Sequence, residues 1–460
     1  MHRWLGVVIL GMFFFMVIVD GSIVTIAVPA MAQSLQVGTE RVNLVISVYL
    51  VTISALLLVF GQLGEVWGRE RLFQLGTLGF VIGSWLAGAS NQLPLVLSGR
   101  VIQGVGASMT MATSYALVTD WFAPGELGRA FGVESIFISI GGLAGPGIGG
   151  LVLAHWDWRY IFWLNVPIGL VCLLASWWVF PRQKKTRPLK HFDWAGGEAL
   201  IGLAISLYAA TALLMTRPLL AAGWLLGFSG LLWWFIRHEA TAVKPLLQLR
   251  LFAAPTFVLP LGAAFCTFVA AYFFTLLAPI YLQLVVHLSS ALTGLVLMGG
   301  PLIAIVGNPV AGVAVERWSQ VRVMVVGITL LVGSTLGLVG LNGKFEPLAL
   351  LGLSLVMAIG TSLFGTANSA YLMSRVHAEG RGAAGAMNSL VREVGLVLGV
   401  TLASASFYGS LTAIGGHVVT DASTQPAGLL LAAQRLSYLV AVVILIVGWR
   451  LSVILAKEGR

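Results

Sequence analysis

Long apolar stretches alternate with short polar or charged ones along the whole chain. A helix needs roughly 20 apolar residues to cross about 30 Å of hydrocarbon, and dividing the chain at its charges and turn residues yields fourteen such stretches. Outer-membrane barrels would instead alternate polar and apolar residues over about ten positions. We therefore predict an all-α membrane protein. Its approximate spans are 5–30, 43–63, 72–90, 94–118, 130–154, 160–180, 194–214, 219–237, 255–282, 290–315, 322–341, 347–370, 383–411 and 429–456.

The composition supports this interpretation, because 58% of the residues are hydrophobic and only 9% are charged. The net charge of +9 comes from basic residues scattered between apolar runs, which excludes a nucleic-acid partner. Cys172 and Cys266 lie inside apolar runs without a second ligand at metal-binding spacing. We expect packed thiols there, and neither a metal nor a cofactor.

The positions of the basic residues predict the orientation, because Lys and Arg in short loops stay in the cytoplasm. With the first residues placed inside, most of the 26 basic residues fall on the cytoplasmic side. The opposite side holds only Arg41, Arg159, Arg217 and Lys344. We therefore expect a multi-pass protein of the cell membrane with both termini in the cytoplasm. The basic run 181–190 is read as a solvated link, with binding of anionic lipid as the alternative.

The loop after the second span recurs in the second half of the chain. Gly61 and Glu65 correspond to Gly312 and Glu316, 251 residues further on. Repeated helical halves around a central cavity are typical of secondary transporters. The repeat therefore predicts a carrier that opens alternately to each side of the membrane.

At these residues the sequence resembles the major facilitator superfamily. The loop from Gly61 to Arg71, which includes Gly68 and Arg69, is similar to its motif G-x-L-a-D-r-x-G-r-k/r, with Glu65 in place of Asp. Residues 100–107 are similar to the R-x-x-q-G-x-g-a pattern of its fourth span.

Two further motifs resemble the fourteen-span drug:proton antiporters of that superfamily. Residues 158–169 are similar to the stretch W-R-w-I-F-x-x-N-x-P-x-G, and the first-span motif keeps Asp20 but has Ser22 and Thr25 in place of Thr and Asn. The resemblance implies a six-helix bundle at 1–182, a linker with two additional helices at 183–245 and a second six-helix bundle at 246–460. The antiporter motif g-x-x-x-G-P-x-x-G-G is matched by Gly141, Gly145, Pro146, Gly149 and Gly150.

The glycines of residues 141–150 have two possible uses. Phosphate binding would need a G-x-x-x-x-G-K-S/T run, and the chain has none. Small residues also let helices approach closely, and Pro146 can kink its helix at a flexing point. We therefore predict close helix packing with a gating role.

Ionisable side chains inside spans indicate function, because each is costly in hydrocarbon unless it is paired or hydrated. Asp20 lies about 22 Å from the start of its span and Arg100 about 9 Å from the outer end of its own, so both have a similar depth. We expect the two to pair or to share a cavity, either as a proton-coupling site or as a static ion pair. Glu393 is the second proton-coupling candidate, although its neighbour Arg392 points about 100° away around the helix.

The charged residues of the loop after the second span are expected to form an inner gate. Glu65 would contact the start of the thirteenth span near Arg381, while Arg69 or Arg71 would pair with Asp120. Three other acids, Glu70, Glu134 and Glu198, are expected to reach water.

Together with these residues, the resemblance implies a proton-coupled antiporter that exports lipophilic, cationic drugs or toxic compounds. The cavity would contain Asp20, Arg100, Gln103, Phe15 and Tyr272, whose aromatic rings suit a cation, although lipid-facing packing would also explain the rings. Protons, an amphipathic substrate and membrane lipids are the expected partners, and the protein is expected to work as a monomer.

The alternative is an exporter of an endogenous metabolite or organic anion. A membrane enzyme is disfavoured because the chain has no D-x-x-x-D cluster, and charged residues inside spans disfavour a receptor or scaffold.

Overall fold

The computed structural model is all-helical throughout its described residues. Those residues are 2–37, 39–180, 192–213, 217–242, 245–247, 249–341, 346–376, 381–416, 422 and 425–458. The all-α prediction is therefore confirmed for the part of the chain that the structure describes. The basic run 181–190 lies outside it.

Two compact units divide the chain. Unit 1 comprises Met1–Ala253 and Met373–Leu390, and unit 2 comprises Ala254–Leu372 and Val391–Arg460. The helices from α1 to α10 belong to unit 1, and those from α11 to α14 and α16 belong to unit 2, apart from the end of α14. Helix α15 begins in unit 1 and continues in unit 2.

The helices of unit 1 follow the predicted spans closely. They are α1 (His2–Leu35), α2 (Thr39–Trp67), α3 (Arg69–Gly88), α4 (Leu93–Trp121), η1 (Pro124–Glu126), α5 (Leu127–His155), α6 (Arg159–Trp163), α7 (Asn165–Val179), α8 (Trp194–Leu213), α9 (Pro218–Thr241) and α10 (Leu249–Phe252). The sixth predicted span is thus divided into α6 and α7.

The helices of unit 2 cover the remaining spans. They are α11 (Pro255–Ile280), η2 (Tyr281–Val285), α12 (Ser290–Arg317), α13 (Gln320–Val339), α14 (Glu346–Ser374), α15 (Arg381–Gly415) and α16 (Ala427–Glu458). Within the described residues, eleven helical segments are long and apolar enough to cross a membrane, and α8 adds a shorter apolar one. Helices α3 and α4 fall outside this set because they carry more polar and charged side chains.

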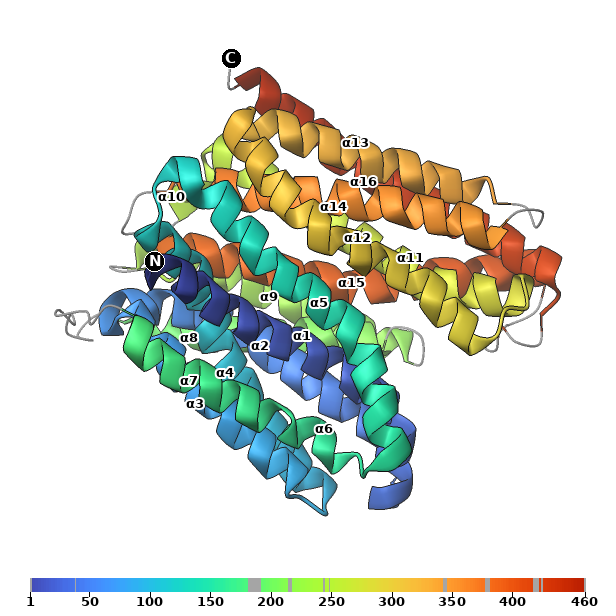
Figure 1. The fold of residues 1–460 in the computed structure, drawn as a ribbon, viewed down its shortest axis with the longest axis horizontal. Coiled ribbons are helices and arrows are strands. Elements are labelled where there is room, and N and C mark those ends of the chain that lie inside the picture. Colours follow the sequence, from blue (N-terminus) through green and yellow to red (C-terminus); the bar gives the residue numbers. More distant parts are fainter. Residues whose placement is uncertain are drawn as a thin grey trace. The chain divides into compact units, whose positions relative to one another are not determined.

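Unit 1 is built from helices that approach one another closely. Helix α1 runs beside α5, and α3 packs against α4 (Figure 1). At Gly83, an added Cβ would lie 2.5 Å from the Gln103 backbone nitrogen. The approach of α3 to α4 therefore depends on small residues, as expected for helices that lack a hydrophobic driving force between them.

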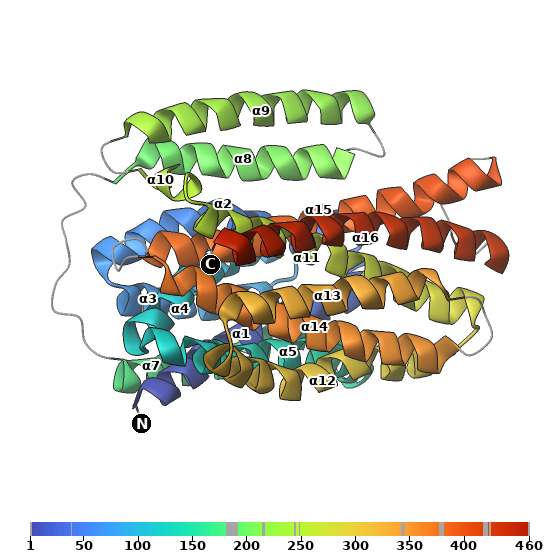
Figure 2. The same cartoon turned by 90° about the horizontal axis from the view of Figure 1, so that it is seen from above.

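The two additional helices form an antiparallel hairpin. Helix α8 lies between α9 and α2, so α9 forms the outer face of unit 1 there (Figure 2). Tyr208 on α8 donates its hydroxyl to Ser47 on α2, which attaches the hairpin to the first helices. Large apolar side chains of α9, among them Leu219 and Leu226, are exposed, as expected for a helix that faces lipid.

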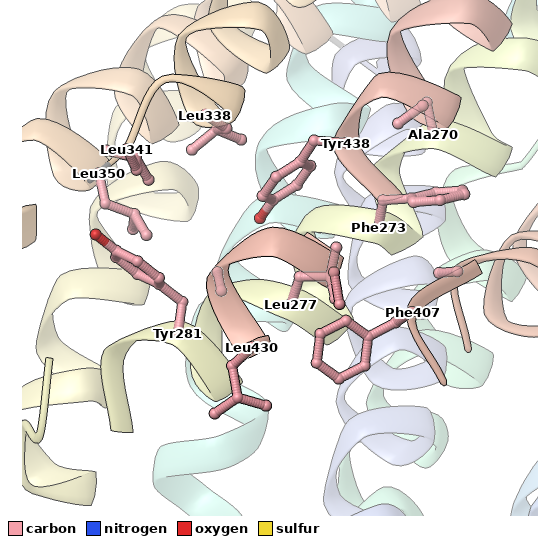
Figure 3. Packing of buried hydrophobic residues seen from close by; sticks show 14 of the residues in the cluster. Ala270, Phe273, Leu277, Tyr281, Leu338, Leu341, Leu350, Phe407, Leu430 and Tyr438 are labelled. Atoms are coloured by element: carbon pink, nitrogen blue, oxygen red, sulfur yellow. The ribbon is translucent and has the colours of Figure 1, made fainter. Parts of the chain in front are cut away.

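Unit 2 has a hydrophobic core built around α11, η2 and α16, to which α13, α14 and α15 add side chains. Tyr281 and Tyr438 are fully buried among leucines, including Leu338 and Leu350 (Figure 3). The π-helical turn η2 begins two residues after Pro279, whose missing N–H removes one backbone hydrogen bond of the helix. The helical register therefore changes at the point where Tyr281 enters the core.

Candidate functional site

The carboxylate of Asp20 lies inside unit 1, with its side chain fully buried. Arg100 on α4 donates from Nη1 to Oδ2 of Asp20 at 2.5 Å. Two amides donate to Oδ1, Asn165 of α7 at 2.8 Å and Gln103 of α4 at 3.2 Å. The predicted pairing of Asp20 with Arg100 is thus present, and three donors from two helices converge on one acid.

The guanidinium of Arg100 is held from several sides. Its Nε donates to the Val45 carbonyl of α2 at 2.9 Å, and Nη1 also donates to Gln103 Oε1 at 2.8 Å. The guanidinium carbon lies 4.0 Å from the centre of the Tyr49 ring and 5.7 Å from that of Phe162. Within the described residues, Nη2 has no hydrogen-bond partner. The cation is therefore fixed by a carboxylate, a carbonyl and two aromatic faces, with one donor group left over.

Gln103 extends this network to α3. Its amide nitrogen donates to the Ser84 hydroxyl at 2.6 Å, and Ser84 donates in turn to the Phe80 carbonyl at 2.7 Å. We name the set Asp20, Ser84, Arg100, Gln103 and Asn165 the Asp20 network. Its members come from four helices, so a change in the charge of the Asp20 carboxylate can alter the contacts among α1, α3, α4 and α7.

Sequence reasoning missed Asn165 as a member of this network. The residue stands inside the stretch 158–169 that resembles the drug:proton antiporters, so the motif contained a usable signal. Its direction toward Asp20 depends on how α7 packs against α1, which the motif does not specify.

The glycine motif brings α5 onto α1 beside Asp20. An added Cβ at Gly145 would collide with the Ser22 hydroxyl, and one at Gly141 would lie 3.0 Å from the Phe15 carbonyl oxygen. Gly149 is less crowded, since its nearest atoms would be 3.5 Å away, and Gly150 has none within 4 Å. The close packing predicted for this motif is therefore present at Gly141 and Gly145. The side chain of Pro146 lies outside the described residues.

A second charged cluster joins the ends of α2, α3 and α4. Gly68, at φ 97°, forms the turn between α2 and α3, a left-handed conformation that favours glycine. Arg69 then forms an ion pair with Asp120 and lies 3.8 Å from Glu65. Of the two arginines expected to reach Asp120, Arg69 does so, whereas Arg71 is exposed.

The start of α15 contacts the same aspartate. Arg381 donates to the Thr119 carbonyl at 3.0 Å and lies 3.3 Å from the Asp120 carboxylate. The contact expected between Glu65 and this helix start stays a prediction. Asp120 therefore joins α3, α4 and α15 at one end of unit 1.

Two acids that we expected to reach water are buried instead. Glu134 is only 2% exposed and accepts a hydrogen bond of 2.6 Å from Ser114. Because α5 begins at Leu127, Glu134 lies about two turns inside the helix and not one. Glu70 is buried because α3 starts directly after Gly68, so its first turn belongs to the packed end of the unit. Glu198 is exposed, as predicted.

Unit 2 contains the other predicted proton-coupling acid. Arg392 donates to Glu393 at 2.9 Å, and both side chains are largely buried. The two long side chains thus meet despite their different directions from the helix. Tyr272 of α11 is close enough to interact electrostatically with Glu393. Phe15 is half-buried on α1, and Glu316 lies near the end of α12.

No group of three or more His, Cys, Asp or Glu side chains within the described ranges could hold a metal ion. Both cysteines are buried.

Comparison with known proteins adds the family. The sequence pattern of the Major Facilitator Superfamily matches residues 10–400. The chain is 30% identical to the riboflavin transporter RibZ of Clostridioides difficile (strain 630), over 89% of this chain and 90% of that protein. It is 31% identical to the tetracenomycin C resistance and export protein of Streptomyces glaucescens, over 85% of this chain and 74% of that protein.

Two further proteins match most of the length of this chain. The drug efflux pump JefA of Mycobacterium tuberculosis (strain ATCC 25618 / H37Rv) is 30% identical, over 89% of this chain and 80% of that protein. The crystal structure of the human organic anion transporter MFSD10 (TETRAN) superposes with a TM-score of 0.65 at 16% sequence identity, covering 98% of this chain and 99% of that one. This last likeness supports the fold.

The apolar helices, the buried charge networks and the family match lead to one assignment. The protein is a multi-pass membrane protein and a transporter, not an enzyme. It belongs to the major facilitator superfamily.

Proposed function

We propose that this transporter is a proton-coupled antiporter that exports lipophilic, cationic compounds from the cytoplasm by alternating access. The observation that carries the proposal is the fully buried Asp20 carboxylate, held by Arg100, Gln103 and Asn165. An acid buried in a membrane span is costly unless it is paired or hydrated, and such residues commonly mark transport pathways. Asp20 of α1 is held by side chains of α4 and α7.

The coupling would work through competition for one carboxylate. A proton that binds Asp20 removes the negative charge that attracts Arg100, so the bond between α1 and α4 weakens. A cationic substrate that reaches Asp20 needs the same negative charge. Proton and substrate therefore exclude each other at this site, which is the requirement for exchange of one against the other.

The Arg69–Asp120–Arg381 cluster would act as the gate on the side predicted to face the cytoplasm. It joins α3 and α4 to the start of α15 through one shared carboxylate. Breaking these contacts would free the helix ends in one state and restoring them would hold the ends together in the other. Such a bistable element is what alternating access needs.

Several relatives support export of drugs, because their names describe resistance and efflux proteins. The Lys and Arg distribution supports a cell-membrane protein with both termini in the cytoplasm. Protons and membrane lipids are the other proposed partners, and a single copy contains all members of the Asp20 network.

A second candidate function is export of a metabolite or organic anion. The observation that favours it is Nη2 of Arg100, a member of the Asp20 network, which has no hydrogen-bond partner among the described residues. A buried guanidinium donor suits a carboxylate or another anionic group of a substrate. The riboflavin transporter among the relatives is consistent with such a substrate.

The decisive experiment uses purified protein in liposomes with a pH gradient. Transport of tetraphenylphosphonium, a lipophilic cation, is compared with transport of riboflavin, while a pH-sensitive dye follows protons. We expect exchange of the cation for protons in the wild type and in the control Glu198→Gln, and loss of both fluxes in Asp20→Asn. Transport of the cation without proton movement, or by Asp20→Asn at the wild-type rate, would remove Asp20 from the mechanism. Riboflavin transport alone would favour the second candidate.

A further inference from the structure

A second pair of acids meets in unit 1, far along the chain from the Asp20 network. Asp193 directly precedes α8, and Glu239 lies in the last turn of α9, so both belong to the same end of the antiparallel hairpin (Figure 2). Glu239 is only 3% exposed, and the side chain of Asp193 only 9%. Neither residue belongs to a transporter motif recognised in the sequence.

Each acid uses one carboxyl oxygen for a structural contact. Oδ1 of Asp193 accepts from the Gly196 N–H at 2.9 Å, which caps the start of α8, and lies 2.8 Å from His238 Nε2. Oε2 of Glu239 accepts from the Leu247 N–H at 2.9 Å. Glu239 therefore attaches the chain that leaves the hairpin to α9 itself.

The remaining two oxygens face each other without a donor between them. Oδ2 of Asp193 and Oε1 of Glu239 are buried and have no hydrogen-bond partner among the described residues. A Cβ placed at Gly196 would lie 2.5 Å from the first oxygen and 2.7 Å from the second, and the two carboxyl groups are within hydrogen-bonding reach of each other. Both oxygens accept hydrogen bonds, so their contact requires a hydrogen that neither supplies when ionised.

Two ionised carboxylates at such a distance repel each other, and burial strengthens the repulsion. The titratable neighbour that the described residues place against the pair is His238, which stacks on Trp234 with ring centroids 4.9 Å apart. Its ring contacts the oxygen of Asp193 that already caps α8, so it leaves the facing oxygens without a donor. A single proton between those oxygens replaces the repulsion with a hydrogen bond.

We propose that Asp193 and Glu239 form a binding site for one proton, which holds the α8–α9 hairpin to the segment 245–247. The segment has a second attachment, because Gln62 of α2 donates to the Pro245 carbonyl at 2.9 Å. With the proton bound, Glu239 keeps its place and its Leu247 contact. When the proton leaves, the carboxylates move apart and the Leu247 contact is lost. This attachment of the segment 245–247, which we call the clasp, is therefore closed at low pH and opens as the pH rises.

Infrared difference spectroscopy tests the proton directly in the full-length protein in detergent. Raising the pH should remove the carbonyl band of a protonated carboxyl group from the wild type and from Glu198→Gln, a control acid exposed on α8. The same band should be missing from Glu239→Gln, in which the amide N–H₂ supplies the donor in place of the proton. A wild-type difference spectrum that matches that of Glu239→Gln would overturn the proposal. Asp193→Asn serves as the reference if Glu239→Gln does not fold.

Thiol labelling tests the opening of the clasp. Leu247→Cys is introduced after Cys172 and Cys266 have been replaced by Ala, with and without Glu239→Gln. As the pH rises toward the value at which the proton leaves, the labelling rate relative to that of the Glu239→Gln protein should rise about tenfold per pH unit, because opening releases one proton. Above that pH the ratio should level off. A constant ratio contradicts the proposal.

Protection of the introduced thiol by added Ca²⁺ or Mg²⁺, seen only in the protein that keeps Glu239, would show that a metal ion, not a proton, occupies the site. Neither measurement depends on transport, so the result is independent of the function proposed for Asp20.

Discussion

Each unit contains a buried acid paired with an arginine, and the two pairs differ in how they are built. In unit 1, Asp20 of α1 meets Arg100 of α4, 80 residues further along the chain, with two amides completing the site. In unit 2, Glu393 meets Arg392, its immediate neighbour on α15. Within the described residues, Arg392 is the one group that donates a hydrogen bond to Glu393.

This difference determines what protonation can do. Neutralising Asp20 weakens a bond between separate helices, so the event can change how α1 and α4 pack. Neutralising Glu393 weakens a hydrogen bond within α15, and that bond joins no second helix. We therefore propose Asp20 for the principal coupling role and expect Glu393 to tune the charge near Tyr272.

The largest effect is expected from exchanging the two acids for their amides. Asp20→Asn should abolish proton-driven efflux in liposomes, because the amide can neither release a proton nor attract Arg100. Glu393→Gln should retain a measurable fraction of the transport. The reverse result would invert the comparison and move the coupling site to unit 2.

Removal of the arginines should have the next largest effect, on stability. Arg100→Met leaves Asp20 buried without its cation, and we expect a loss of about 3–5 kcal/mol in the free energy of unfolding. Arg392→Met should cost less, because Glu393 is slightly exposed and less enclosed by donors. Thermal unfolding in detergent measures both, and Asp20→Asn combined with Arg100→Met should recover part of the loss. Equal destabilisation by the two arginine variants would contradict the distinction.

A smaller effect is expected from the glycines that bring helices together in each unit. Gly145→Ala would push a methyl group into the Ser22 hydroxyl, whereas Gly142→Ala, the matched control, meets nothing within 4 Å. We expect Gly145→Ala to lower the free energy of unfolding by about 1–3 kcal/mol. Ser22→Ala should restore part of it.

In unit 2, the corresponding variant Gly399→Ala should not be rescued by a second side-chain substitution. An added Cβ at Gly399 would lie 2.8 Å from the Val269 carbonyl oxygen, a backbone atom that no side-chain change removes. Gly399→Ala should therefore be at least as damaging as Gly145→Ala. Urea or thermal unfolding measures the loss of stability. A smaller loss for Gly399→Ala than for Gly142→Ala would refute the packing argument for unit 2.

The smallest effect is expected at the gate. Glu65→Gln removes a contact of 3.8 Å with Arg69 at a partly exposed position, and such pairs contribute about 0.2–1 kcal/mol. Turnover should slow by up to about fivefold, with little change in substrate affinity. Initial rates over a range of substrate concentrations separate the two parameters, with Glu198→Gln as the control. A change in affinity alone would argue against a gating role.

Much of the helical architecture could be predicted from residue patterns, because the cost of placing polar groups in lipid, or apolar groups in water, is local and repeats along each span. Each of the fourteen predicted spans is helical in the described residues, the sixth as two helices, and those that hold Asp20 and Arg100 are among them. The pairing of these two residues was also predictable, since their depths follow from the rise of a helix. The division of the sixth span and the burial of Glu134 were not, because both depend on where a helix begins.

The sequence by itself determined that the chain spans a membrane, which residues lie in its helices and at what depth the charged ones sit. Only the tertiary structure decided which side chains meet: Asn165 at Asp20, Arg69 in place of Arg71 at Asp120, and Glu239 opposite Asp193. The reason is physical. Depth depends on the number of residues from a helix end, whereas contact depends on the rotation of each helix about its axis, and that rotation is set by packing against neighbours distant in the chain.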